Sequence, residues 1–166
     1  MSTDTAKSPL PDPYADPAAH LAARTQRLHE AHTEMAGAFL HSAAPAIRAL
    51  WPRAERVIFD RTAHDADPRH PVTFLRIEGA YGAVIATREE ADALDRESQA
   101  LLRDALAEVY AAVLHWDAGA VPGARPWCVH STYGFQDGAT PPFLCTVTLP
   151  PAGAAAPRLD ALDCIG

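Results

Sequence analysis

The sequence predicts an α+β fold: a two-layer sandwich in which two main helices cover an antiparallel sheet of about five strands, in the order α-β-β-β-α-β-β. Three observations support this prediction. Two long segments repeat apolar residues with a helical period, and several short segments are rich in β-branched and aromatic residues. Short loops join strands that follow one another in the chain, which favours antiparallel pairing.

A hairpin is the clearest pair of strands. Residues 72–78 form the first strand, and strict alternation places Phe74, Arg76 and Glu78 on one face. Two glycines three residues apart then permit a tight reversal. Residues 83–86 are expected to form the return strand.

The helix after this hairpin has a well-defined start. Thr87 and Glu90 have the spacing of a capping box, in which each side chain accepts a hydrogen bond from the backbone N–H of the other residue. Apolar residues recur at helical spacing as far as Trp116, and Gly119 is the expected stop. We therefore predict one continuous helix between these limits.

The first helix is expected to begin at Asp16, an N-cap residue, with Pro17 at the first helical position. Apolar residues repeat by seven, and two alanines form a second seam that Arg24 interrupts. These residues are Leu21, Leu28 and Met35, with Ala31 and Ala38 three positions after the last two. Pro45 predicts a break or kink near residues 41–44, because proline cannot continue the helical hydrogen bonds.

Three further strands complete the predicted sheet. Residues 56–61 are expected to form a short strand, and residues 62–71 a polar loop. After the second helix, residues 127–135 and 142–149 are expected to form the last two strands. The same order of elements occurs in several small binding folds, and it resembles that of bacterial secretion-chaperone-like domains in topology only.

The length of 166 residues indicates one domain. We expect a flexible tail over residues 1–15, a single α+β domain over residues 16–149 and a loose tail over residues 150–166. The chain shows no signal-peptide pattern and no apolar run long enough to span a membrane. Its three cysteines do not suggest a disulfide framework and favour reduced thiols in a cytoplasmic protein.

The net charge of −7 argues against a nucleic-acid-binding surface. Of the 14 basic residues only Lys7 is a lysine, and the chain contains 15 prolines and many alanines. This composition is typical of proteins from GC-rich bacteria. It bears on the source and not on the function.

The loop between the first two strands contains the densest group of potential metal ligands: His64, Asp65, Asp67 and His70. Imidazole and carboxylate groups suit zinc or another divalent ion. The alternative is a solvated loop, because aspartate and proline are common turn residues. No other cofactor is predicted.

A second group of polar residues is expected on the strands. Cys128 and His130 lie two residues apart and share a strand face, with Cys145 on the neighbouring strand. A ligand pocket between sheet and helices would use these three residues with Arg76, Glu78 and Tyr133. Tyr133 requires a bulge to reach the face of His130. The alternative is that the cysteines are small core residues and that Arg76 and Glu78 lie on an exposed face.

Two histidines of the first helix, His29 and His32, are three residues apart, whereas the zinc-protease helix needs histidines four apart. A solvated polar face is the expected role for them. No phosphate-binding glycine loop, nucleophile elbow or paired CxxC motif is present. An enzyme is therefore less expected than a binding protein, and no catalytic residue is assigned.

The favoured hypothesis is a small acidic module that binds another protein, as an adaptor, an immunity-type inhibitor or a chaperone-like partner. Its acidic surface would favour a basic partner. A homodimer through the first helix is also expected from its alanine seam. The rival hypothesis is a small-ligand or metal-binding protein or enzyme with the pocket described above. Neither nucleic acid nor a membrane is an expected partner.

Overall fold

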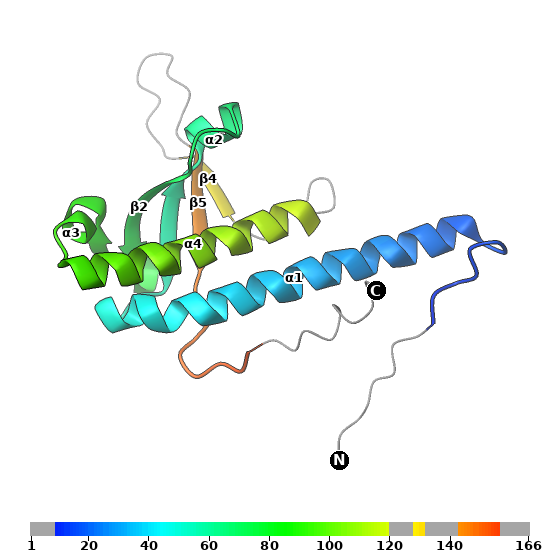
Figure 1. Cartoon of the computed structure of the whole chain (residues 1–166), viewed down its shortest axis with the longest axis horizontal. Helices are drawn as coiled ribbons and strands as arrows, with labels where there is room; N and C mark the ends of the chain where they lie inside the picture. The colour runs from blue at the N-terminus through cyan, green and yellow to red at the C-terminus, as the bar shows by residue number, and fades with distance from the viewer. Residues whose placement is uncertain (1–8, 120–127, 132–142, 157–166) are drawn as a thin grey trace.

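The structure, a computed structural model, describes residues 9–119, 128–131 and 143–156. It confirms the α+β class, because an antiparallel sheet shares one hydrophobic core with the helices (Figure 1). The predicted boundaries of the two tails remain predictions, since residues 1–8 and 157–166 lie outside the described residues.

Two long helices dominate the fold. Helix α1 spans Pro17–Leu50, and helix α4 spans Arg96–Gly119 and runs beside it in the opposite direction (Figure 1). The short helical elements are α2 (Thr62–Ala66), η1 (Ala80–Gly82) and α3 (Arg88–Asp92). Within the described part of the chain, neither long helix nor any other has the length and apolar character needed to cross a membrane.

The strands form one sheet in the order β3-β2-β1-β5-β4, and all neighbouring pairs are antiparallel. The strands are β1 (Arg56–Asp60), β2 (Thr73–Glu78), β3 (Val84–Thr87), β4 (Cys128–Ser131) and β5 (Phe143–Thr148). The predicted strand at residues 127–135 is described only over 128–131, because residues 132–142 lie outside the described residues. The other strands agree with their predicted ranges to within one or two residues.

Alanines form much of the contact between the helices and the sheet. The core combines small residues of both helices with branched residues of the central strands. Fully buried members are Ala36, Ala43 and Ile47 of α1, Val109 and Ala112 of α4, and Val57 and Ile77 of the sheet. Small side chains allow two helix backbones to approach closely. Ala31 is the one buried residue of the predicted seam; Met35 and Ala38 are half-buried, and Leu21 and Leu28 are exposed.

The predicted break at Pro45 is wrong. Helix α1 continues through this proline to Leu50. Pro45 is exposed, whereas Ala44 and Ile47 beside it are buried in the core. Burial of these neighbours offsets the hydrogen bond that proline cannot make. Ser42, within the predicted break, donates from its hydroxyl to Glu108 of α4 at 3.0 Å.

The helix predicted from Thr87 to Gly119 is two helices, α3 and α4. The carboxylate of Asp95 accepts hydrogen bonds from the backbone N–H groups of Glu97 and Ser98, each at 3.0 Å. These bonds satisfy amides that have no partner at the start of a helix, so a new helix begins here. Hydrogen bonds from Ser98 also lower the pKa of Asp95.

Strict alternation along β2 is also wrong. The register between β1 and β2 shifts between Ile58 and Phe59, so that Phe59 pairs with Phe74. The two rings meet edge to face with centroids 6.5 Å apart. Phe74 and Ile77 therefore both contact the core, and Phe74 does not share the face of Arg76. A β-bulge of this kind reverses the facing of every residue beyond it.

The capping box at Thr87 is present as predicted, with Thr87 N–H donating to Glu90 at 2.7 Å and Glu90 N–H donating to Thr87 at 3.3 Å. Replacing Thr87 by alanine should lower the free energy of unfolding by about 1 kcal/mol. Thr33→Ala is the control, because the Thr33 hydroxyl bonds only its own helix at the carbonyl of His29. Chemical denaturation that gives equal losses for both variants would contradict the capping role.

The turn after β2 leaves no room for a side chain at Gly79. A Cβ there would lie 2.7 Å from Cδ1 of Ile85 and 3.0 Å from the carbonyl oxygen of Arg53. Gly79→Ala should therefore destabilise the fold by about 1–3 kcal/mol. Ile85→Val removes the closest atom, so the double variant should lose less stability than the sum of the single variants. Additive losses in denaturation experiments would show that this contact is not the cause.

Candidate functional site

The first half of α1 extends beyond the rest of the fold. We call residues 17–30 the overhang; at 1.5 Å per residue it is about 21 Å long. None of these residues, all of which the structure describes, is buried, and the buried residues of α1 begin at Ala31. The overhang reaches past the end of α4 (Figure 1). No residue of the hydrophobic core lies in this segment of α1.

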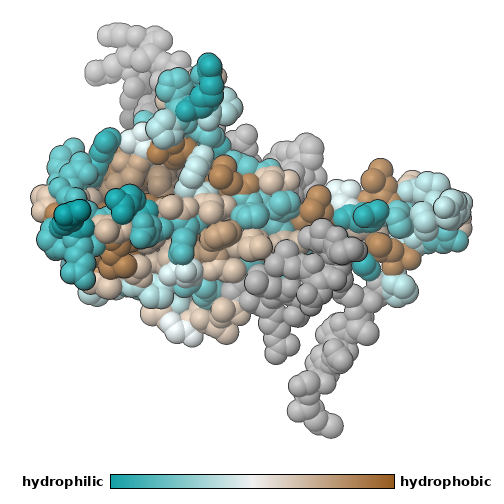
Figure 2. Space-filling view, in the orientation of Figure 1, coloured by the Kyte–Doolittle hydropathy of each residue, from teal (hydrophilic) through white to brown (hydrophobic). Residues whose placement is uncertain are grey.

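The overhang is amphipathic and basic. Leu21 and Leu28 are 67% and 47% exposed, and Leu21 exceeds the exposed leucines of α4, Leu101 at 40% and Leu114 at 45%. Apolar and polar patches alternate along this projection (Figure 2). Between Pro17 and His29 the sequence has two arginines, Arg24 and Arg27, and no carboxylate. This segment is therefore positively charged in a chain whose net charge is −7.

A histidine pair lies at the base of the overhang. Nδ1 of His32 on α1 is 3.1 Å from Nδ1 of His115 on α4, so one nitrogen donates and the other accepts. The His115 ring also stacks on Phe39 with centroids 5.5 Å apart. Partial burial, followed by the charges of His115 and His29, lowers the pKa of His32. His32 therefore remains neutral to a lower pH than a solvated histidine.

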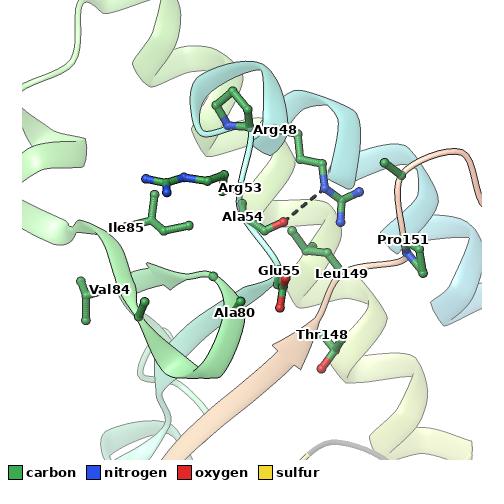
Figure 3. A pocket seen from close by; sticks show the side chains of 14 residues that line it. Arg48, Arg53, Ala54, Glu55, Ala80, Val84, Ile85, Thr148, Leu149 and Pro151 are labelled. Atoms are coloured by element: carbon green, nitrogen blue, oxygen red, sulfur yellow. Dashed lines mark hydrogen bonds between the residues drawn. The ribbon is translucent and has the colours of Figure 1, made fainter.

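A cavity of about 710 Å³ lies at the opposite end of α1. The end of α1, the start of β1, the β2–β3 turn and the end of β5 surround it (Figure 3). Residues that line it include Arg48, Arg53, Glu55, Val84, Ile85 and Leu149. Its volume is within the range of small-molecule sites.

The charges of this cavity do not form a joint binding site. Arg48 donates from Nε to the carbonyl oxygen of Ala54 at 3.2 Å. Arg53 extends to the other side of the Ala54 backbone (Figure 3). Because the two guanidinium groups point apart, they cannot clamp one carboxylate or phosphate between them. The cavity thus lacks the convergent polar groups that typify a ligand site.

A second groove, of about 480 Å³, lies between β2 and helices α3 and α4. Phe74, Leu102 and Leu106 provide its apolar surface, and Arg88 and Arg103 lie at its edge. Neither this groove nor the larger cavity is lined by the residues that the sequence suggested for a pocket.

Two of those predicted pocket residues contact each other. Arg76 donates from Nε to Glu78 at 2.8 Å, and Nε of Arg56 lies 3.7 Å from the other carboxylate oxygen of Glu78. Glu78 is only 8% exposed. The carboxylate of Glu78 thus pairs with two arginines, one on its own strand and one on the neighbouring strand. The three side chains form an ion-pair network within the sheet.

The predicted cysteine–histidine group is only partly described. Cys145 is buried in the core between sheet and helices. In the register of β4 and β5 it is opposite Val129, whereas Cys128 is opposite Thr146 and His130 is opposite Leu144. Cys145 is therefore not directly paired with either residue. Tyr133 lies outside the described residues.

The predicted metal-binding loop makes internal contacts. His64 places Nδ1 2.9 Å from the carbonyl oxygen of His70 and Nε2 3.5 Å from the hydroxyl of Tyr110. Asp67 accepts three side-chain hydrogen bonds from Arg69, and Nδ1 of His70 is 3.6 Å from it. Asp65 belongs to helix α2. Over residues 9–119, 128–131 and 143–156, no three histidine, cysteine, aspartate or glutamate side chains are grouped as in a metal site.

The sequence predicted the seven-residue apolar repeat of the overhang, but it did not predict that this repeat is exposed. It also did not predict the contact between His32 and His115. His32 and His115 are 83 positions apart, so no local spacing could connect them. The only sequence signal for the overhang was Arg24 in the apolar seam, together with the absence of acidic residues around it.

Comparison with known proteins does not assign the chain to a family. No protein-family model matches the chain, and no curated protein or solved structure is significantly similar to it.

Proposed function

We propose that the protein is a binding module for another protein and that the overhang of α1 is its contact element. The observation that carries this proposal is the exposure of Leu21 and Leu28 on a helix in which no residue from 17 to 30 is buried. A two-layer sandwich of five strands and two long helices, as the sequence predicts, would serve as the rigid base.

The overhang is prepared for binding because it is already helical. The side chain of Asp16 accepts from the backbone N–H of Ala19 at 2.9 Å, and Pro17 occupies the first turn. The same helix continues into the core, where Ile47 is fully buried. Anchoring one half of a helix lowers the cost of nucleating the other half. A partner therefore need not meet the full entropic cost of ordering this segment.

The chemistry of the overhang indicates the partner. Leu21 and Leu28 are two turns apart on one side, as in helices that bind in an apolar groove. Full burial of a leucine side chain contributes about 1.5–3 kcal/mol. Arg24, which is exposed, lies beside this side and would pair with a carboxylate of the partner. We therefore propose a partner with an apolar groove and an acidic rim, whereas the net charge alone suggested a basic partner.

A second copy of the chain fits this surface less well. Two overhangs paired through their leucines in antiparallel orientation would bring Arg24 of one copy close to Arg24 of the other. Like charges in contact are unfavourable. The homodimer predicted from the alanine seam is also disfavoured because Ala31 of that seam is buried within the chain itself and Ala38 is half-buried.

The rival proposal, a ligand or metal pocket between sheet and helices, has less support. Its residues Arg76 and Glu78 neutralise each other, and Cys145 is a core residue. The observed cavities are lined by other residues.

The double variant Leu21→Glu with Leu28→Glu tests the proposed contact. Two charges in the apolar stripe should weaken partner binding by more than about tenfold, since each buried leucine contributes more than 1.4 kcal/mol. The fold should not change, because both residues are exposed and glutamate favours helices. The measurement is quantitative co-purification of partners from a lysate, with sedimentation velocity of the isolated chain.

The matched control is Gln26→Glu with Thr33→Glu. Each of these exposed residues follows a leucine of the stripe by five positions, about 140° around the helix, and adds the same charge. The control should retain the partner that the first variant loses. Equal retention by both variants would contradict the proposal. A dimer of the isolated chain that only the leucine variant dissociates would identify a second copy as the partner.

A further inference from the structure

We propose that His32 and His115 bind a divalent transition-metal ion, such as nickel(II) or zinc(II), through Nδ1 of each ring. The site lies where α4 ends beside α1, at the base of the overhang. The inference does not depend on the proposed protein partner.

The distance between the two nitrogens fits shared coordination. Histidine nitrogens lie about 2.0–2.1 Å from zinc, which places two of them about 3.3 Å apart at a tetrahedral angle and about 2.9 Å apart at a right angle. The two Nδ1 atoms here are 3.1 Å apart, between these limits. An ion can therefore enter after small rotations of the rings, without movement of the helices.

The packing of α1 and α4 holds the two rings in place. His115 stacks on Phe39 at an interplanar angle of 22°, and the rings of His32 and His115 are tilted by 41° with centroids 5.4 Å apart. Ala36 and Ala112, which belong to the same two helices, are fully buried. Preorganised ligands lose little conformational entropy when an ion binds.

The protonation of the pair also suits metal binding. In the hydrogen bond, one Nδ1 carries a proton and the other presents its lone pair. When an ion binds both Nδ1 atoms, the donor ring moves its proton to Nε2, so two neutral rings remain and the proton count does not change. Partial burial lowers the pKa of His32, which favours the neutral form that can act as a ligand.

The class of ion follows from the ligand set. Imidazole is a preferred ligand of zinc, nickel and copper. Among the described residues, no third histidine, cysteine, aspartate or glutamate completes a group with this pair. Both rings are partly exposed, so water can occupy the remaining coordination positions. The bound ion would link α1 to α4 at the point where the overhang begins.

The experiment is a titration of the tag-free full-length chain with nickel(II) chloride, measured by isothermal calorimetry. The unaltered chain should bind one ion, and His32→Gln and His115→Gln should each weaken binding by at least about tenfold. Loss of a residue that only hydrogen-bonds a metal ligand already weakens binding by about tenfold, and here a ligand itself is removed. His41→Gln is the matched control, because it removes a histidine of the same helix outside the pair. This control should bind as the unaltered chain does.

Nitrogen-15 NMR of the unaltered chain with zinc(II) gives a second readout that does not depend on how the variants fold. The Nδ1 signals of His32 and His115 should both move to the shifts of metal-bound imidazole, with the proton on Nε2. Absence of binding, or unchanged binding in both pair variants, would overturn the proposal. Zinc-dependent shifts confined to other histidines, such as His64 and His70, would also overturn it.

Discussion

Close packing of α1 against α4 and the sheet is the constraint on which the rest of the structure depends. Ala36, Ala43 and Ala112 are fully buried, and their small side chains let the two helix backbones approach each other above the central strands. The same packing keeps α1 continuous through Pro45, whose lost hydrogen bond is a local cost within a well-packed helix. The relative positions of the two helices, and therefore everything at their ends, follow from this contact.

The two helices differ in length, and this difference generates the candidate site. Helix α1 has 34 residues and α4 has 24, so in the antiparallel pair the start of α1 extends past the end of α4 (Figure 1). The uncovered part carries Leu21 and Leu28 with two arginines and no carboxylate before Glu30. At its base, the end of α4 brings His115 to His32. The difference in length between α1 and α4 thus accounts for both the exposed start of α1 and the position of the histidine pair.

Much of the fold could be predicted because it depends on local chemistry. The Thr87 capping box, the start of α1 at Asp16 and the approximate ranges of β1, β2, β3 and β5 follow from spacing and propensity. The predictions fail where a contact between residues distant in sequence, or a second local signal, outweighs the local pattern on which the prediction was based. Packing keeps α1 continuous at Pro45, the Asp95 carboxylate begins a new helix, and a register shift turns Phe74 towards Phe59. The histidine pair could not be predicted, because it depends on how far α4 extends along α1.

Hydrogen–deuterium exchange of the dilute isolated chain tests the central claim most directly. Because no residue of the overhang is buried, its amides open without loss of buried contacts, whereas those of α1 from Ala36 to Ile47 open only with the core. The account therefore predicts much faster exchange over residues 20–29 than over residues 36–47. Equal protection of the two halves of α1 in the dilute chain would show that the first half is packed against its own chain, and would contradict its role as a free contact helix.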